Sequence, residues 1–242
     1  MSALLTVDGL SKSFGAVIVA DQTSFQVEEG AAIGILGPNG AGKTSLFNLI
    51  TGALRADAGR IDFQGRDITH VGAAGRCKLG IARSFQVPHP FVGMTVFENA
   101  LVGATEGAGL RGHEAEEHVL KVLEDTGLLP KANVRAGTLT LLERKRLEMA
   151  RALSAKPKLL LLDEIAGGLT EAECGALIDT IQRVHAGGTT IVWIEHVVHA
   201  LLAVVEKLIV IDFGKKIAEG EPKAIMDSAE VKEIYLGVDP DV

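Results

Sequence analysis

The residues best suited to chemistry in this sequence form one glycine-rich octapeptide, Gly-Pro-Asn-Gly-Ala-Gly-Lys-Thr, at positions 37–44. Glycines let successive backbone N–H groups turn toward phosphate oxygens, and Lys43 can reach the β- and γ-phosphates of a nucleotide. The hydroxyl of Thr44 can hold Mg²⁺. The residues predicted to contact the nucleotide in this stretch are Gly37, Pro38, Asn39, Gly40, Ala41, Gly42, Lys43, Thr44 and Ser45.

The segments on either side of the octapeptide match this interpretation. Residues 31–36 (AAIGIL) predict a short buried strand, and residues 44–51 (TSLFNLIT) predict the start of a helix. The order of strand, glycine-rich loop and helix is the context in which the motif binds phosphate, since the helix adds its positive N-terminal end. The alternative is a glycine-rich turn with a surface lysine, which does not require that order.

A second group of residues follows four consecutive leucines at positions 159–162. This run predicts a central parallel strand, and it delivers Asp163 and Glu164 at its end. Asp163 is predicted to hold the metal, directly or through water, as the magnesium-side aspartate of such sites. Glu164 is predicted to polarise the water that attacks the γ-phosphate. The alternative is an Asp-Glu pair that caps the next helix.

Three single residues are further candidates. His196 follows a predicted strand at Thr190–Ile194, and ligands of open parallel sheets gather at strand ends, so His196 can bridge the γ-phosphate and the attacking water. The amide of Gln86 can touch Mg²⁺ or that water. Phe14 can stack on adenine. The alternatives are a structural histidine, a solvated loop glutamine and a core phenylalanine.

The remaining pattern predicts an α/β fold with a mostly parallel central sheet, an N-terminal antiparallel β subdomain and an inserted helical subdomain. Expected strands lie at 4–7, 23–27, 60–63 and 208–211, and expected helices at Val96–Val102, 114–124, 144–153 and 172–185. Residues 103–112 are glycine-rich and predict a mobile surface loop. We expect one domain over residues 1–242, with a catalytic core at 1–85 and 158–242 and a helical lobe at 86–157.

Composition excludes several classes of protein. The formal net charge of −7 argues against a nucleic-acid surface. Cys77 and Cys174 form no C-x-x-C motif, so neither a disulfide framework nor a zinc site is predicted. Residues 189–213 are the most apolar stretch, but charged residues interrupt it, which favours strand, helix and strand over a membrane span. Any link to a membrane should therefore run through a partner.

Taken in this order, these residues resemble an ATP-binding cassette (ABC) ATPase over nearly the whole chain. Within that family the sequence looks most like the ATPase subunits of bacterial branched-chain amino-acid importers. The stretches that carry this narrower resemblance are 80–86 (GIARSFQ), 94–99 (MTVFEN), 146–153 (RLEMARAL), and the segment from 217–220 (IAEG) to 235–237 (YLG).

The resemblance implies an assembly as well as an activity. Two such subunits, alike or different, close head to tail over two ATP molecules with Mg²⁺, so that each ATP lies between one subunit's phosphate loop and the other's signature helix. Closure drives two transmembrane permeases, which residues 87–97 would contact, and a periplasmic binding protein supplies the solute. This places the chain on the cytoplasmic face of the inner membrane, held there through its permeases.

The sequence departs from the family at the signature, Leu-Ser-Gly-Gly-Gln. The matching residues, predicted to face the partner's ATP, are Leu139, Thr140, Leu141, Leu142 and Glu143. Two leucines replace glycines that allow close approach to phosphate, and Glu143 adds negative charge. Either the leucines block that approach, or the hydroxyl and helix dipole suffice. Ile165 replaces the usual proline, and Thr170 stands where Asp or Asn is common.

The sequence thus predicts an ATP-hydrolysing subunit of an ABC importer for branched-chain or related amino acids. One rival is a soluble ABC-type ATPase that remodels a macromolecule, but such proteins usually join two cassettes or carry long insertions. A second rival is a low-turnover nucleotide-dependent clamp, which the altered signature suggests and the retained Glu164 and His196 oppose.

Overall fold

The computed structural model describes residues 3–236, and the chain divides into two compact units. The first unit comprises Met1–Ala73 and Val192–Val242, and the second comprises Ala74–Ile191. Strand β8 (Thr190–Ile194) carries the chain from the second unit back into the first. The chain therefore leaves the first unit once, builds the second and returns.

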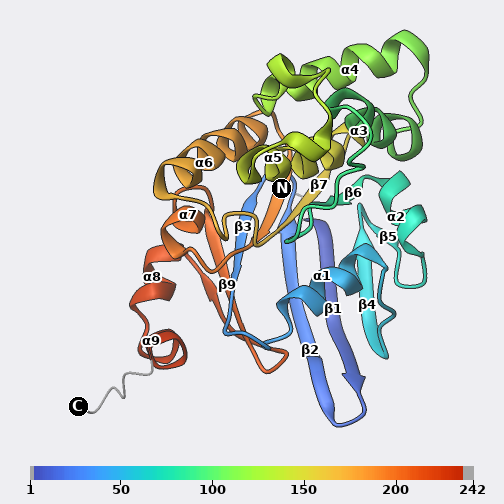
Figure 1. The fold of residues 1–242 in the computed structure, drawn as a ribbon. Coiled ribbons are helices and arrows are strands. Elements are labelled where there is room, and N and C mark those ends of the chain that lie inside the picture. The colour runs from blue at the N-terminus through green and yellow to red at the C-terminus, as the bar shows by residue number, and fades with distance from the viewer. Residues whose placement is uncertain (1–2, 237–242) are drawn as a thin grey trace. The chain divides into compact units, whose positions relative to one another are not determined.

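The first unit contains a four-stranded antiparallel sheet in the order β2-β1-β4-β5. Its strands are β1 (Ala3–Phe14), β2 (Val17–Glu28), β4 (Ala58–Phe63) and β5 (Arg66–Asp67). Figure 1 draws β1 and β2 as two long blue arrows joined by a tight turn, in which Gly15 has a φ of 60°. These strands contain the expected strands at 4–7, 23–27 and 60–63, so the predicted antiparallel subdomain is confirmed.

Parallel pairing begins in the same unit. Strand β3 (Ala32–Leu36) pairs in parallel with β9 (Lys207–Asp212), which pairs antiparallel with β10 (Lys215–Gly220). All five residues of β3 are buried, as expected for an aliphatic strand covered on both faces. The helices of this unit are α1 (Lys43–Thr51), α7 (Val198–Leu202), α8 (Pro222–Asp227) and α9 (Ala229–Leu236). Gly237, the end of the C-terminal resembling stretch, lies outside the described residues.

The second unit joins a pair of strands to most of the helices. Strands β6 (Ile81–Arg83) and β7 (Leu159–Asp163) are parallel, with Arg83 opposite Leu161. The helices are α2 (Ala73–Leu79), α3 (Val96–Val102), α4 (Gly112–Asp125), α5 (Leu141–Ser154) and α6 (Glu171–Ala186), with 3-10 turns η2 (Leu129–Lys131) and η3 (Ala136–Thr138). The expected α/β fold with a mostly parallel sheet and an inserted helical region is thus confirmed.

The expectation of a loop at residues 103–112 is wrong for residues 103–107. Residues Gly103–Gly107 form a π-helical turn, η1, directly after α3, and Ala104 within it is fully buried. A Cβ on Gly103 would lie 2.3 Å from the carbonyl oxygen of Arg151 in α5. The glycines therefore mark close packing of two helical segments, because only glycine allows so short an approach.

Strand β8 holds the only tryptophan of the sequence, Trp193. All five β8 residues are buried, and Trp193 has no exposed surface. Its indole nitrogen has no hydrogen-bond partner among residues 3–236.

Candidate functional site

The glycines of residues 37–44 occupy positions that other residues cannot adopt. Gly40 and Gly42 have φ values of 84° and 101°. A Cβ on Gly37 would lie 2.1 Å from the carbonyl oxygen of Ile211, and one on Gly42 would lie 2.2 Å from that of Val19. The loop is thus packed against neighbouring backbone and fixed in shape.

Lys43 lies over this loop as the first residue of α1 and is only 5% exposed. Its ammonium donates hydrogen bonds to the carbonyl oxygens of Gly37 (2.7 Å) and Pro38 (2.9 Å). Gly42, the N-cap, has no side chain, and the first turn of α1 carries no acid. The helix therefore presents its positive end with no carboxylate of its first turn to balance it, an arrangement suited to an anion.

The two candidate acids lie at the end of β7. Asp163 is the last residue of that strand and is 1% exposed. It forms an ion pair with Arg83 from the neighbouring strand β6. The sequence reasoning gave Arg83 no role. No strand is predicted at 81–83 from the sequence, and the partner of Arg83 depends on which strands are adjacent.

Glu164 follows with a positive φ of 48°, which sharply turns the chain after β7. The amide of Gln86 donates a hydrogen bond to the Oε2 of Glu164 at 2.5 Å. The structure therefore brings together two residues that the sequence proposed separately for the catalytic step. The backbone turn separates the directions of Asp163 and Glu164, so adjacent acids can serve different tasks.

The altered signature begins helix α5. The Oγ1 of Thr140 accepts a hydrogen bond from the N–H of Glu143 (3.4 Å), and the Oε2 of Glu143 accepts one from the N–H of Thr140 (2.9 Å). These reciprocal bonds form a capping box. Of the neighbouring residues, Leu139 is buried, Leu141 is 43% exposed and Leu142 is partly exposed. The helix N-terminus thus uses two of its own donors internally.

Glu143 is also neutralised within the chain. It forms an ion pair with Lys131 of η2. Partial burial raises the pKa of Glu143, but the hydrogen bonds from Lys131 and the Thr140 N–H outweigh it and hold the pKa below its ordinary value. The carboxylate is therefore kept ionised, and its charge is met locally.

The last two sequence candidates are exposed. His196 follows β8, and its N–H donates to the Oε2 of Glu195 at 2.9 Å, so Glu195, 1% exposed, shapes this turn. Phe14 ends β1 and is 53% exposed, with the ammonium of Lys12 5.3 Å from the centre of its ring. Both side chains are accessible, as the predicted contacts with a nucleotide require.

Residues 3–236 contain no cluster of three or more His, Cys, Asp or Glu side chains able to hold a metal. A Mg²⁺ site built from one protein carboxylate, a hydroxyl and nucleotide phosphates needs no such cluster. Asp163 fits that role, since its carboxylate offers the oxygen ligands that Mg²⁺ takes. The donor set at Asp163 is therefore compatible with Mg²⁺ delivered by a nucleotide.

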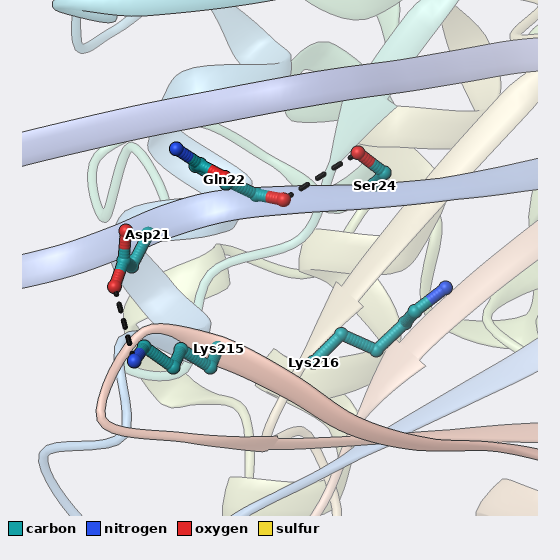
Figure 2. A pocket seen from close by; sticks show the side chains of 5 residues that line it. All are labelled: Asp21, Gln22, Ser24, Lys215 and Lys216. Carbon is teal, nitrogen blue, oxygen red and sulfur yellow. Dashed lines mark hydrogen bonds and ion pairs between the residues drawn. The ribbon is translucent and has the colours of Figure 1, made fainter.

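A separate open hollow of about 470 Å³ lies on the first unit. It is lined by Asp21, Gln22 and Ser24 of β2 with Lys215 and Lys216 of β10. Figure 2 shows Lys215 reaching Asp21 (3.4 Å) and the Gln22 carbonyl bonded to the Ser24 hydroxyl (3.4 Å). Lys216 pairs instead with Glu219 at 2.6 Å, and no residue predicted from the sequence lies among the lining residues.

Within the described part of the chain, no helix has the length and apolar character needed to cross a bilayer.

Known proteins resemble this chain along its length. A family model described as ABC transporter matches residues 20–167. The high-affinity branched-chain amino acid transport ATP-binding protein of Pseudomonas aeruginosa is 34% identical, over 97% of this chain and 98% of its own. A lipopolysaccharide export system ATP-binding protein of Acidithiobacillus ferridurans is 33% identical, over 98% of each chain.

A solved structure agrees. The ADP conformation of an ATP-binding cassette from an ABC transporter superimposes with a TM-score of 0.89 at 33% identity, covering 98% of this chain and 100% of that one. The glycine loop, the acids at the end of β7 and these similarities all support the same assignment. The chain belongs to the ABC transporter family and is one of its ATP-binding, ATP-hydrolysing subunits.

Proposed function

We propose that this ATPase powers the import of branched-chain or related amino acids through partner permeases. The observation that carries the proposal is its 34% identity, over nearly its full length, to a branched-chain amino acid transport ATP-binding protein. The resembling stretches at 80–86 and 94–99 flank the exposed segment that would meet a permease, which supports the narrower assignment.

In this proposal the loop of residues 37–45 binds the phosphates of ATP, and Phe14 stacks on its adenine. Lys43, now hydrogen-bonded to two loop carbonyls, turns its donors to the β- and γ-phosphates. Thr44, Asp163 and Gln86 hold Mg²⁺. The ion, when bound, offsets the negative charge that develops on the phosphates.

Glu164 acts as the general base. Its carboxylate accepts a proton from the attacking water, whose oxygen forms a bond to the γ-phosphorus as the bond to the β,γ-bridging oxygen breaks, leaving ADP and phosphate. His196 orients the water and the γ-phosphate. Gln86, bonded to Glu164 here, holds that carboxylate in position before ATP arrives.

The proposed assembly uses the exposed surface of the second unit. Phe85, Val87, Phe91 and Val92 are 49% to 64% exposed, an unusual density of exposed apolar side chains in one segment. We propose that this segment contacts a permease on the cytoplasmic face of the inner membrane, and that a second ATPase subunit completes each site. A periplasmic binding protein would deliver the solute. We retain residues 86–157 as the helical lobe, which lies wholly within the second unit.

A second candidate is export of a lipid, because the lipopolysaccharide-export relative is nearly as similar, at 33% identity over 98% of both chains. Amino-acid import and lipid export differ in the solute that the permeases transport, and both use the same ATPase site.

Transport by the host cell separates these candidates. Cells carrying Lys43→Ala in place of the native chain should lose uptake of radiolabelled leucine and its close analogues while keeping normal lipid export. Normal leucine uptake with defective export of lipid would replace the importer with the exporter. Permeases that co-purify with the tagged chain should be identified in the same cells.

A further inference from the structure

Both acids at the end of β7 are held by one short segment, residues 83–86. Arg83 forms an ion pair with Asp163, and Gln86 donates to Glu164 at 2.5 Å. The side chains of Arg83 and Asp163 are 6% and 2% exposed. One segment thus contacts the proposed metal ligand through a cation and the proposed base through an amide.

This arrangement follows from the strand pairing. Arg83 lies opposite Leu161 in the parallel pair β6–β7, and the Ser84 N–H donates to the Leu161 carbonyl at 2.9 Å. The register brings the residue after Leu161–Leu162, Asp163, beside the end of β6. The Arg83 guanidinium also lies 5.1 Å from the centre of the half-exposed Phe85 ring, so a second favourable contact is at hand.

A buried carboxylate needs a cation, because removal of its charge from water is costly unless it is paired. Arg83 meets that need when no metal is present. Mg²⁺ at the same carboxylate would meet it too, but two cations beside one carboxylate repel each other at short range. Arg83 and the metal therefore compete for Asp163.

We propose that Arg83 is an internal counterion that holds Asp163 in the metal-free enzyme and gives way when a Mg²⁺–nucleotide binds. This inference rests on the metal role of Asp163 in the proposed function. Arg83 is a positioning residue: it holds the carboxylate of Asp163 in place, and it lowers the affinity for Mg²⁺ by the cost of its own displacement. Mg²⁺ binding would also loosen the segment that leads to Gln86.

The test is ADP binding with and without Mg²⁺, measured by calorimetry so that no turnover is involved. The quantity compared is the ratio of the two affinities. Arg83→Met removes the guanidinium that competes with Mg²⁺ and keeps an unbranched side chain. Mg²⁺ should therefore strengthen ADP binding at least about ten-fold more in this variant than in the wild type. The matched control is Arg60→Met, which breaks an exposed pair with Asp62 in the first unit and should leave the ratio unchanged.

Thermal unfolding without nucleotide supplies a readout that does not depend on binding. Arg83→Met and Asp163→Asn should each lower Tm, and the double variant should recover much of the loss, because neither buried charge is then left alone. If Arg83→Met does not fold, Arg83→Lys keeps the charge but lacks the planar fork of the guanidinium, and it should give a smaller rise in the Mg²⁺ ratio.

Two failures can be told apart. Equal Mg²⁺ ratios in the wild type and in the Arg83 variants, with a reduced ratio in Asp163→Asn, would overturn the counterion role and leave the metal site intact. An undiminished ratio in Asp163→Asn would instead overturn the metal role of Asp163 within the proposed function.

Discussion

Lys43 places one positive charge beside the carbonyl oxygens of Gly37 and Pro38. The ammonium is nearly buried, so hydrogen bonds must offset its removal from water. A phosphate group would return more, since charge-assisted hydrogen bonds are the stronger kind. The residue is thus folded into a conformation that an anion would improve.

Lys43→Ala should abolish ATP binding and hydrolysis without unfolding the chain, because the charge that meets the β- and γ-phosphates is lost. Nucleotide binding and circular dichroism measured on the same sample check this. Lys215→Ala is the control, since the ammonium of that exposed lysine pairs with Asp21. Normal hydrolysis by folded Lys43→Ala would remove the loop from the active site.

Glu164→Gln should lower hydrolysis by about 10²- to 10⁴-fold, the range for losing a general base. ATP binding should survive, since Asp163 and Thr44 are unchanged, and the amide oxygen can still accept from Gln86. Phosphate release and equilibrium ATP binding are the measurements, and size-exclusion chromatography should reveal an accumulated ATP-loaded dimer. Unchanged turnover would move the base elsewhere, with His196 the next residue to test.

At the scale of elements, helix α5 holds the segment that follows β6. Glu148, 2% exposed on α5, accepts from the N–H of His89 at 2.9 Å and pairs with Arg151 at 3.1 Å. Arg151 donates to the His89 carbonyl at 2.9 Å and lies 5.4 Å from the centre of the Phe91 ring. The exposed apolar segment is therefore fixed to the helix whose start is the altered signature.

This network predicts a pH dependence of stability. Burial raises the pKa of Glu148 above its ordinary 4.5, and Arg151 and the His89 N–H only partly offset it. As pH rises above the unfolded value, the unfolded chain loses this proton first, so stability falls until the folded pKa is passed. Glu148→Gln lacks the titration. Relative to the wild type, the free energy of unfolding of Glu148→Gln should therefore increase as the pH rises above the ordinary glutamate pKa of 4.5.

Urea unfolding of both proteins at several pH values measures that difference. Glu230→Gln, on α9, is the control, because it removes an acid that is exposed to solvent. A wild-type advantage that grows toward neutral pH would mean that the Arg151 pair outweighs burial at Glu148.

Elements built on unambiguous patterns were predictable from sequence. The aliphatic runs of β3, β7 and β8 predicted buried strands. Asp163 and Glu164 lie at the end of β7, where a parallel sheet places functional groups. Residues 103–107 misled because glycine signals both loops and close helix packing, and only the tertiary neighbour, Arg151, decides between them. The Arg83–Asp163 pair was missed because strand order is a tertiary property. The roles of the individual site residues stay predictions.

At the scale of the whole molecule, a single chain carries an intact phosphate loop and an altered signature. In the proposed dimer each ATP needs a loop from one subunit and a signature from the other. The capping box of Thr140 and Glu143 already uses donors at the start of α5, which favours a weakened signature. A homodimer would then use it at both sites.

We expect the isolated chain to hydrolyse ATP slowly and a partner subunit with Leu-Ser-Gly-Gly-Gln to accelerate it, since one site would then be complete. Leu141→Gly with Leu142→Gly should raise the isolated rate, unless a helix cost of about 1 kcal/mol per glycine disorders the segment. Phosphate release from the three samples decides this, with circular dichroism as the control for folding. A fast isolated enzyme, slowed by the glycines and indifferent to a partner, would mean that the leucines belong to a working signature.

The burial of Trp193 gives this protein a built-in optical probe. The sequence has one tryptophan, so all indole emission reports the same place, the fourth of the five residues of β8. The side chain of Trp193 has no exposed surface, and the residue lies three positions before His196 in the sequence. The native protein should fluoresce at the blue end of the indole range and shift to the red as β8 separates from its neighbours. Titrating ATP while watching that emission follows this strand without any label.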